Sequence, residues 1–178
     1  SDWHCDTPKC RPALLFADLE LAWKRYAGVF CFGDLFCAMQ GAKDRRGSKS
    51  AIRPEHLGSD YFDRLVNDAT EKLLPYAQDF VLFGQGNHET AILRHNETDL
   101  LERLSYRLHK EGESPVLVGG YSGYVWFQFK YRKTVSSRKI LKFHHGYGGG
   151  AAVTKGAIQQ QRAAVMFPGA QPSAILIP

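Results

Sequence analysis

The chain has 178 residues, which is enough for one domain with a buried core. Hydrophobic residues make up 44% and charged residues 23%, as in an ordinary globular protein, and these values exclude a largely disordered chain. The formal net charge of +5 suits a phosphate-rich partner but does not require one.

The cellular location is inferred from two kinds of segment that the sequence lacks. No apolar run approaches the roughly eighteen residues of a membrane span, and no secretion signal opens the sequence. We therefore expect a protein of the cytoplasm that makes no membrane contact. The sequence leaves its oligomeric state open.

The cysteines, at positions 5, 10, 31 and 37, do not have the spacing of a common zinc site. Because no secretion signal accompanies them, a disulfide framework is not expected either. Free buried thiols are the expectation, and a zinc clip or a redox pair is the alternative.

The first elements along the chain are a helix and a strand. Residues 14–26 carry apolar side chains at mixed helical spacing and predict the helix. The short apolar run at residues 29–32 predicts a buried strand, and Gly33-Asp34 places a carboxylate at its carboxyl end. A loop rich in Gly, Ser, Lys and Arg follows over residues 41–53.

An amphipathic helix is expected next, with Ser59 as its N-cap and Pro75 at its end. Its apolar face is formed by Phe62, Leu65, Val66, Ala69 and Leu73. Residues 80–83 predict a second buried strand, which leads directly into a glycine-rich turn. Leucines between positions 100 and 108 then predict a helix that ends near Gly112.

The second part of the chain is rich in β-branched and aromatic residues with glycine-rich joins, which favours strands. The expected strands cover residues 116–118, 124–131, 139–143 and 174–177. A turn is expected at residues 134–138, and a helix at residues 155–166.

The order of these elements predicts an α/β fold with helices packed on sheets, in a single domain over residues 1–178. Several of the strands end in residues that bind metals well. The carboxyl ends of strands are where α/β folds usually build their sites.

Four short clusters join a metal-binding side chain to a glycine turn or to a chain end. They are Asp2-Trp3-His4, Gly33-Asp34, Gly86-Asn87-His88-Glu89 and His145-Gly146. Carboxylate, amide and imidazole ligands suit Mn, Fe, Zn or Mg rather than a thiolate site. Any one cluster occurs by chance, whereas the four together, three of them after apolar segments, indicate a metal site.

This series of clusters resembles the calcineurin-like metallophosphoesterases over nearly the whole chain. Residues 36–55 and 88–101 resemble more narrowly the members carried by phages and prophages. The resemblance implies a layered sandwich of mixed β-sheets flanked by helices. It also implies a metal-dependent phosphoester hydrolase, either a phosphodiesterase or nuclease or a phosphatase, acting on a substrate such as DNA or a nucleotide. A phage-encoded protein would work in the host cytoplasm.

The resemblance also implies two divalent metal ions, with manganese expected first and iron, zinc or magnesium as alternatives. Asp2 and His4 would bind the first metal, Asn87 and His145 the second, and Asp34 would bridge the two. A bridging carboxylate can hold two cations about 3.5–4 Å apart, where both act on an in-line displacement.

His88 would serve as the acid that protonates the leaving oxygen, or would stabilise the phosphoryl charge, and Glu89 would orient it. His144 competes with His145 for one ligand position, since neighbours on a strand point to opposite faces. The glycine that follows His145 favours that residue, because glycine permits the turn at the site.

Two other features have open interpretations. The basic loop at residues 43–49, with Arg45 and Arg46, either grips phosphate or is a solvated loop, and Arg53 is similar. The aromatic residues of the expected strand 124–131 either stack on nucleic-acid bases or pack in a sheet, and packing is the expectation.

Two family elements are missing from these residues. The family places a Gly-His-x-His element after a late strand, but only Pro178 follows residues 174–177, and no strand precedes Asp2. We therefore expect a domain that is truncated at both ends, binds metal weakly and has little activity.

Two alternative functions remain, a non-catalytic module that binds nucleic acid or protein, and a zinc-stabilised domain. The latter would use His4, Cys5, Cys10 and either Cys31 or Cys37.

Overall fold

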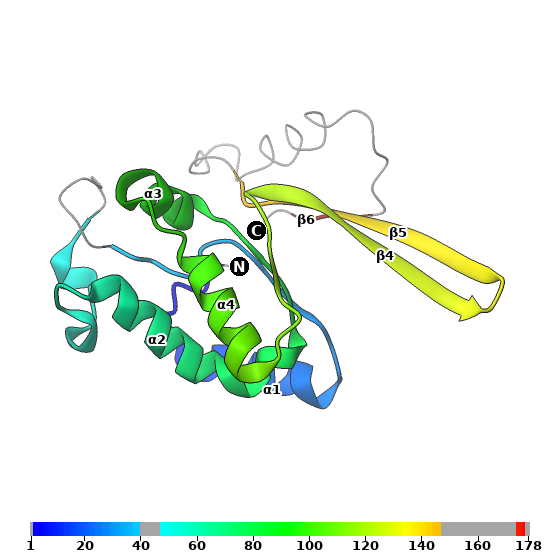
Figure 1. Cartoon of the computed structure of the whole chain (residues 1–178), viewed down its shortest axis with the longest axis horizontal. Helices are drawn as coiled ribbons and strands as arrows, with labels where there is room; N and C mark the ends of the chain where they lie inside the picture. Colours follow the sequence, from blue (N-terminus) through cyan, green and yellow to red (C-terminus); the bar gives the residue numbers. More distant parts are fainter. Residues whose placement is uncertain (1, 40–46, 147–173, 177–178) are drawn as a thin grey trace, which may run out of the picture. The chain divides into compact units, whose positions relative to one another are not determined.

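The computed structural model describes residues 2–39, 47–146 and 174–176 (Figure 1). It contains both helices and strands, so the expected α/β class is confirmed. The chain divides into two compact units, Ser1–Tyr121 and Ser122–Pro178. A single domain over all residues stays a prediction, and the two units are described separately here.

The first unit is built on a small parallel sheet with the strand order β1-β2-β3. The strands are β1 (Val29–Phe32), β2 (Phe80–Gly84) and β3 (Leu117–Val118). Parallel neighbours need a crossover connection, and helices supply it between each pair of strands. The carboxyl ends of β1 and β2 therefore lie next to each other at one edge of the sheet.

In the described part of this unit, four α-helices and three short 3-10 helices accompany the sheet. They are α1 (Pro12–Lys24), α2 (Tyr61–Leu73), α3 (Asn87–Asn96) and α4 (Leu100–Gly112), with η1 (Lys49–Ala51), η2 (Pro54–His56) and η3 (Leu74–Asp79). Helix α2 packs against α4 (Figure 1). Among the described residues, no helix combines the length and the apolar character that crossing a membrane requires.

The core of the first unit is made by the apolar faces of α2 and α4 against the strands. Leu65 of α2, Leu104 of α4 and Phe83 of β2 are each at most 1% exposed. Asp99 caps α4, because its carboxylate accepts hydrogen bonds from the Leu101 and Glu102 N–H groups at 2.9 and 3.1 Å. The buried side chains and the Asp99 cap therefore stabilise α2 and α4 against the sheet.

Two expectations for local structure need correction, and a third is not tested. Asp60, not Ser59, precedes α2, and no side chain caps this helix end. The hairpin turn is Lys133–Thr134, whereas the expected turn at residues 134–138 is mostly strand, because the pairing of β5 with β4 starts at Val135. The helix expected at residues 155–166 lies outside the described residues.

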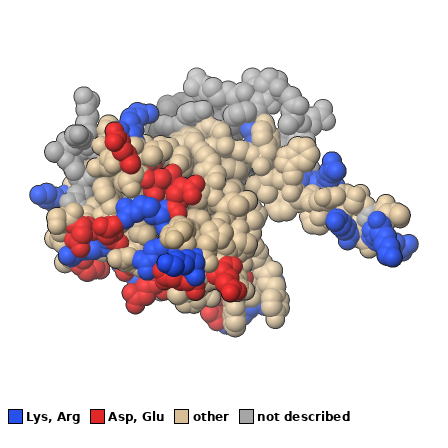
Figure 2. Space-filling model, in the orientation of Figure 1, with Lys and Arg blue, Asp and Glu red and all other residues tan. Residues whose placement is uncertain are grey.

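The second unit contains a long β-hairpin and a short third strand. Strand β4 (Ser122–Arg132) pairs antiparallel with β5 (Val135–His144), and β6 (Ala174–Leu176) pairs parallel with β5. Residues 122–146 contain Lys and Arg but no Asp or Glu. Figure 2 shows basic side chains along this hairpin. The hairpin is therefore uniformly positive.

Truncation of a core leucine tests this packing. We expect Leu104→Ala to lower the free energy of unfolding by about 2–5 kcal/mol, since it removes buried methyl groups and leaves a cavity. Leu93→Ala is the matched control, because Leu93 is 41% exposed on α3 and should cost much less. Urea unfolding of both variants checks this, and equal losses would contradict the assigned core.

Candidate metal centre

The turn after β1 presents the central carboxylate of the site. Gly33 and Asp34 both have positive φ values, 106° and 52°, which glycine adopts freely and aspartate tolerates. Asp34 is buried. The sequence pattern Gly-Asp therefore marks a turn whose backbone only a few residue types can adopt.

Glu89 of α3 holds this turn in place. Its Oε2 accepts hydrogen bonds from the Asp34 N–H (3.0 Å) and the Gly86 N–H (2.9 Å), and its Oε1 accepts one from the Phe36 N–H (2.9 Å). Glu89 was expected to orient the His88 ring, but its carboxylate instead binds the backbone of the two turns. Sequence patterns do not reveal such contacts.

The charge state of Glu89 reflects opposing influences. Burial first, and the nearby Asp34 carboxylate in addition, raise its pKa to about 7. Backbone hydrogen bonds, those from Phe36 and Gly86 among them, act in the opposite direction and favour the ionised form. Glu89 is thus a structural carboxylate, stabilised by backbone groups rather than by a basic side chain.

Gly86 permits α3 to approach the Asp34 turn. A Cβ atom at this position would lie 2.1 Å from Asp34 Oδ1 and 2.4 Å from the Asp34 backbone nitrogen. Asp34 Oδ1 accepts a hydrogen bond from the His88 N–H at 3.0 Å, at the positive end of the helix dipole. Only glycine fits this contact, so the sequence Gly-Asn-His-Glu has a direct structural explanation.

The N-terminal segment brings a histidine to the same carboxylate. The Asp2 N–H donates to the Gly33 carbonyl (3.0 Å) and the His4 N–H to the Asp34 carbonyl (2.9 Å), so this segment runs beside the turn. His4 Nε2 lies 3.8 Å and His88 Nε2 lies 3.9 Å from Asp34 Oδ2. The ring centroids of the two histidines are 4.8 Å apart.

These distances fit a shared cation better than direct hydrogen bonds. They exceed the usual range for hydrogen bonds. Two ligands bound at about 2.1 Å to one tetrahedral ion would lie about 3.4 Å apart. The buried Nδ1 of His4 has no hydrogen-bond partner among the described residues. The carboxylate oxygen of Asp34 and the Nε2 atoms of His4 and His88 are donors that divalent metal ions accept, so the residues present fit a metal ion.

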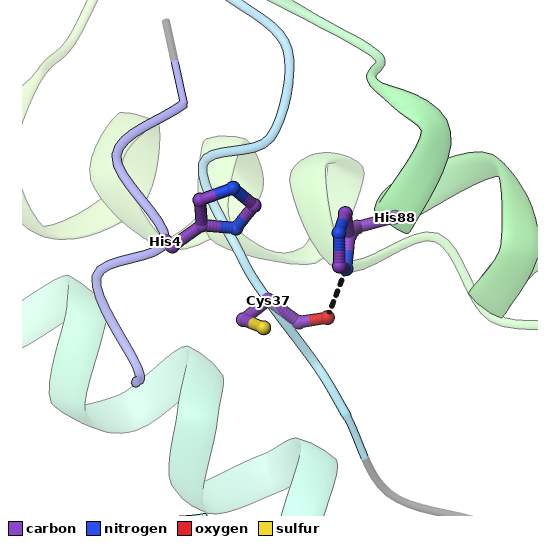
Figure 3. A group of neighbouring side chains, drawn as sticks. All are labelled: His4, Cys37 and His88. Carbon is purple, nitrogen blue, oxygen red and sulfur yellow. Dashed lines mark hydrogen bonds between the residues drawn. The ribbon is translucent and has the colours of Figure 1, made fainter. Parts of the chain in front are cut away.

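The structure also fixes the tautomer of His88. Its Nδ1 lies 2.6 Å from the Cys37 carbonyl oxygen (Figure 3). Because a carbonyl only accepts, Nδ1 carries the proton and donates it, as metal-binding histidines commonly do toward a backbone carbonyl. In the neutral ring, Nε2 then presents a lone pair on the side of Asp34.

Cys37 lies in this site, although the sequence indicated it only as a possible ligand of a cysteine-based zinc domain. One ligand atom from each of His4, Cys37 and His88 lies within 4.8 Å of the others (Figure 3). The position of Cys37 only three residues after Asp34 was the one available signal. All four cysteines are free, as expected, but only Cys31 is fully buried, and the other three are partly exposed. Burial raises the pKa of the Cys31 thiol to about 12.

The other expected metal ligands differ in their exposure and in the unit to which they belong. Asp2 and Asn87 are both exposed, and Asn87 is the first residue of α3. His145 directly follows β5 in the second unit, so its place beside the first unit's ligands stays a prediction. His144 Nδ1 accepts a hydrogen bond from the Gly146 N–H at 2.7 Å, and Gly146 has a φ of 108°, which confirms the expected glycine turn.

The expected substrate-binding arginines receive little support. Arg45 and Arg46 lie outside the described residues. The Arg53 guanidinium donates two hydrogen bonds of 3.3 Å to the Thr7 carbonyl and lies 3.9 Å from Glu55. These contacts bind Arg53 to the protein's own loops, so a role in gripping phosphate would require them to change.

Comparison of the chain with protein-family models, with curated proteins and with solved structures found no match in any of the three. The resemblance noted in the sequence therefore stays a hypothesis, which depends on the motifs and on the geometry around Asp34.

Gly86 provides a test of this geometry. We expect Gly86→Ala to lower the free energy of unfolding by about 1–3 kcal/mol, because the new methyl group overlaps the Asp34 turn. Gly58→Ala is the control, since the added methyl group would meet only the Asp60 and Arg64 side chains, which can move. Thermal and urea unfolding measure both variants. A harmless Gly86→Ala would argue against the close packing of α3 on this turn.

Proposed function

We propose that this chain carries the metal centre of a phosphoester hydrolase of the calcineurin-like metallophosphoesterase type, with that family's layered sandwich. One observation carries the proposal. The buried Asp34 carboxylate has the Nε2 atoms of His4 and His88 at 3.8 and 3.9 Å from a single oxygen. The motif order in the sequence and the carboxyl-end location on a parallel sheet support the same function.

The donor set around Asp34 suits divalent cations. Asp2, Asn87 and His145 would complete the ligands of two such ions, with manganese expected first. When bound, the two cations polarise a phosphoryl oxygen and lower the pKa of a water molecule. Asp34 is rigidly held by Glu89 and by the His88 N–H, which limits the reorganisation needed on binding.

In the proposed reaction, His88 would donate or accept a proton. Its Nδ1–H is committed to the Cys37 carbonyl, so proton exchange takes place at Nε2. In the imidazolium form, Nε2 would donate a proton to the leaving oxygen or stabilise charge on the phosphoryl group.

The proposed reaction can be tested with a generic bis-aryl phosphodiester and added Mn²⁺. We expect the full-length protein to hydrolyse it and Asp34→Asn and His88→Ala to lose roughly 100-fold or more of kcat/KM, in line with loss of a metal bridge or a general acid. His95→Ala is the matched control, because His95 is exposed on the same helix. Metal-independent turnover, or full activity in Asp34→Asn, would refute the proposal.

A second candidate function is nucleic-acid binding by the β4–β5 hairpin. Trp126 (64% exposed) and Tyr131 (67% exposed) are open to solvent, whereas packing in a sheet was expected for this aromatic strand. Exposed basic residues accompany them, namely Lys130, Arg132, Lys133, Arg138 and Lys139. Aromatic rings that stack on bases, beside cations that contact phosphates, are typical of single-strand binding. The function could accompany hydrolysis or replace it.

This candidate predicts a specific loss of binding. We expect Trp126→Ala to weaken binding of a single-stranded oligonucleotide about fivefold or more, the effect of losing one stacked base. Tyr106→Ala is the control, because Tyr106 is 65% exposed on α4, away from the hairpin sequence. Fluorescence anisotropy at several salt concentrations measures both. Equal affinities for the two variants would exclude stacking on Trp126.

A further inference from the structure

Cys37 is held in the candidate metal centre by contacts on both sides of its backbone. Its N–H donates to Asp6 Oδ1 at 2.5 Å, and the N–H of Ala38 donates to Asp6 Oδ2 at 2.8 Å. Its carbonyl accepts the hydrogen bond from His88 Nδ1. Asp6 is buried, and Ala38 has a positive φ of 50°. The position of this cysteine is therefore specified by the fold around it.

The thiol belongs to a cluster of three metal-binding side chains from separate segments. His4 comes from the N-terminal segment, Cys37 from the loop after β1, and His88 from the first turn of α3 (Figure 3). One donor atom of each lies within 4.8 Å of the others. The buried, unpartnered Nδ1 of His4 is an independent sign of an unsatisfied ligand in the described part of the chain.

The chemistry of these donors selects among metals. Magnesium and manganese prefer oxygen ligands, whereas thiolate with imidazole nitrogen favours zinc and other thiophilic ions. Zinc commonly takes mixed sulfur and nitrogen ligands in a four-coordinate site. A sulfur donor beside two imidazoles is thus not the donor set that a manganese site would require.

We propose that Cys37 supplies a thiolate ligand, together with His4 and His88, that makes this position selective for Zn²⁺ over Mn²⁺ and Mg²⁺. The inference rests on the proposed metal centre and expects zinc in place of manganese at this one position. Because His88 Nδ1 is bonded to the Cys37 carbonyl, Nε2 would bind the ion here, and His88 would then act as a ligand in place of the proton donor considered above. It also gives Cys37 a role as a ligand rather than as a packed thiol. Binding releases the thiol proton to solvent, so the affinity for Zn²⁺ rises with pH.

Cobalt substitution tests this assignment without relying on catalysis. Co²⁺ replaces Zn²⁺ in such sites, and a cobalt–thiolate bond gives a charge-transfer absorption band in the near ultraviolet. We expect the metal-free, reduced chain to develop this band on Co²⁺ titration. Cys37→Ser should lose the band, while Cys10→Ser, which alters a thiol outside the cluster, should keep it. Far-ultraviolet circular dichroism checks that both variants are folded.

A competition assay provides a second measurement on the same proteins. We expect Cys37→Ser to lower the affinity for Zn²⁺ at least about tenfold, since losing even an outer-shell partner carries that cost, and to change the affinity for Mn²⁺ much less. Equal losses for the two ions would overturn the claim of selectivity.

The remaining outcomes separate this inference from the proposed function. Co²⁺ binding without a charge-transfer band would overturn the Cys37 ligand but leave a centre of oxygen and nitrogen donors. Loss of the band in Cys10→Ser instead of Cys37→Ser would also overturn it and would favour a cysteine-based zinc domain. Failure of a folded chain to bind Co²⁺, Zn²⁺ or Mn²⁺ would reject the metal centre itself.

Discussion

The hydrogen bonds of the buried Glu89 carboxylate are the interaction on which the candidate site depends. They join two turns that are far apart in sequence, since Glu89 lies 55 residues from Asp34 and 53 residues from Phe36. The two turns follow β1 and β2, which are neighbours in a parallel sheet. One carboxylate can therefore satisfy backbone N–H groups of both turns at once, and burial without such partners would be costly.

Once these turns are joined, the chemistry-bearing residues have little freedom. Gly86 allows α3 to touch the Asp34 turn, and the first turn of α3 then directs the His88 N–H to Asp34 Oδ1. The N-terminal segment adds His4 by pairing its backbone with the same turn. A metal ion bound here would meet side chains that are already held in place, because the segments carrying them are fixed by hydrogen bonds to their backbone.

The two compact units carry different kinds of chemistry. The first holds carboxylate, imidazole and thiol groups around the end of a parallel sheet, which suits a metal ion. The second carries exposed aromatic and basic side chains on a hairpin, which suits a single-stranded polyanion. A nuclease would use both properties, whereas a phosphatase would need only the first and a binding module only the second. The variants of the metal centre and the variant of the hairpin can therefore be interpreted independently.

The sequence by itself determined the short strands β1 and β2, the long helices and the positions of Asp34 and His88 just after these two strands, because apolar runs and glycine turns are local signals. Only the tertiary structure decided the partners of Glu89, the place of Cys37 and the exposure of Trp126. Each of these depends on contacts, or on their absence, between segments distant along the chain. Such relations follow from how the elements pack, and no local pattern encodes them.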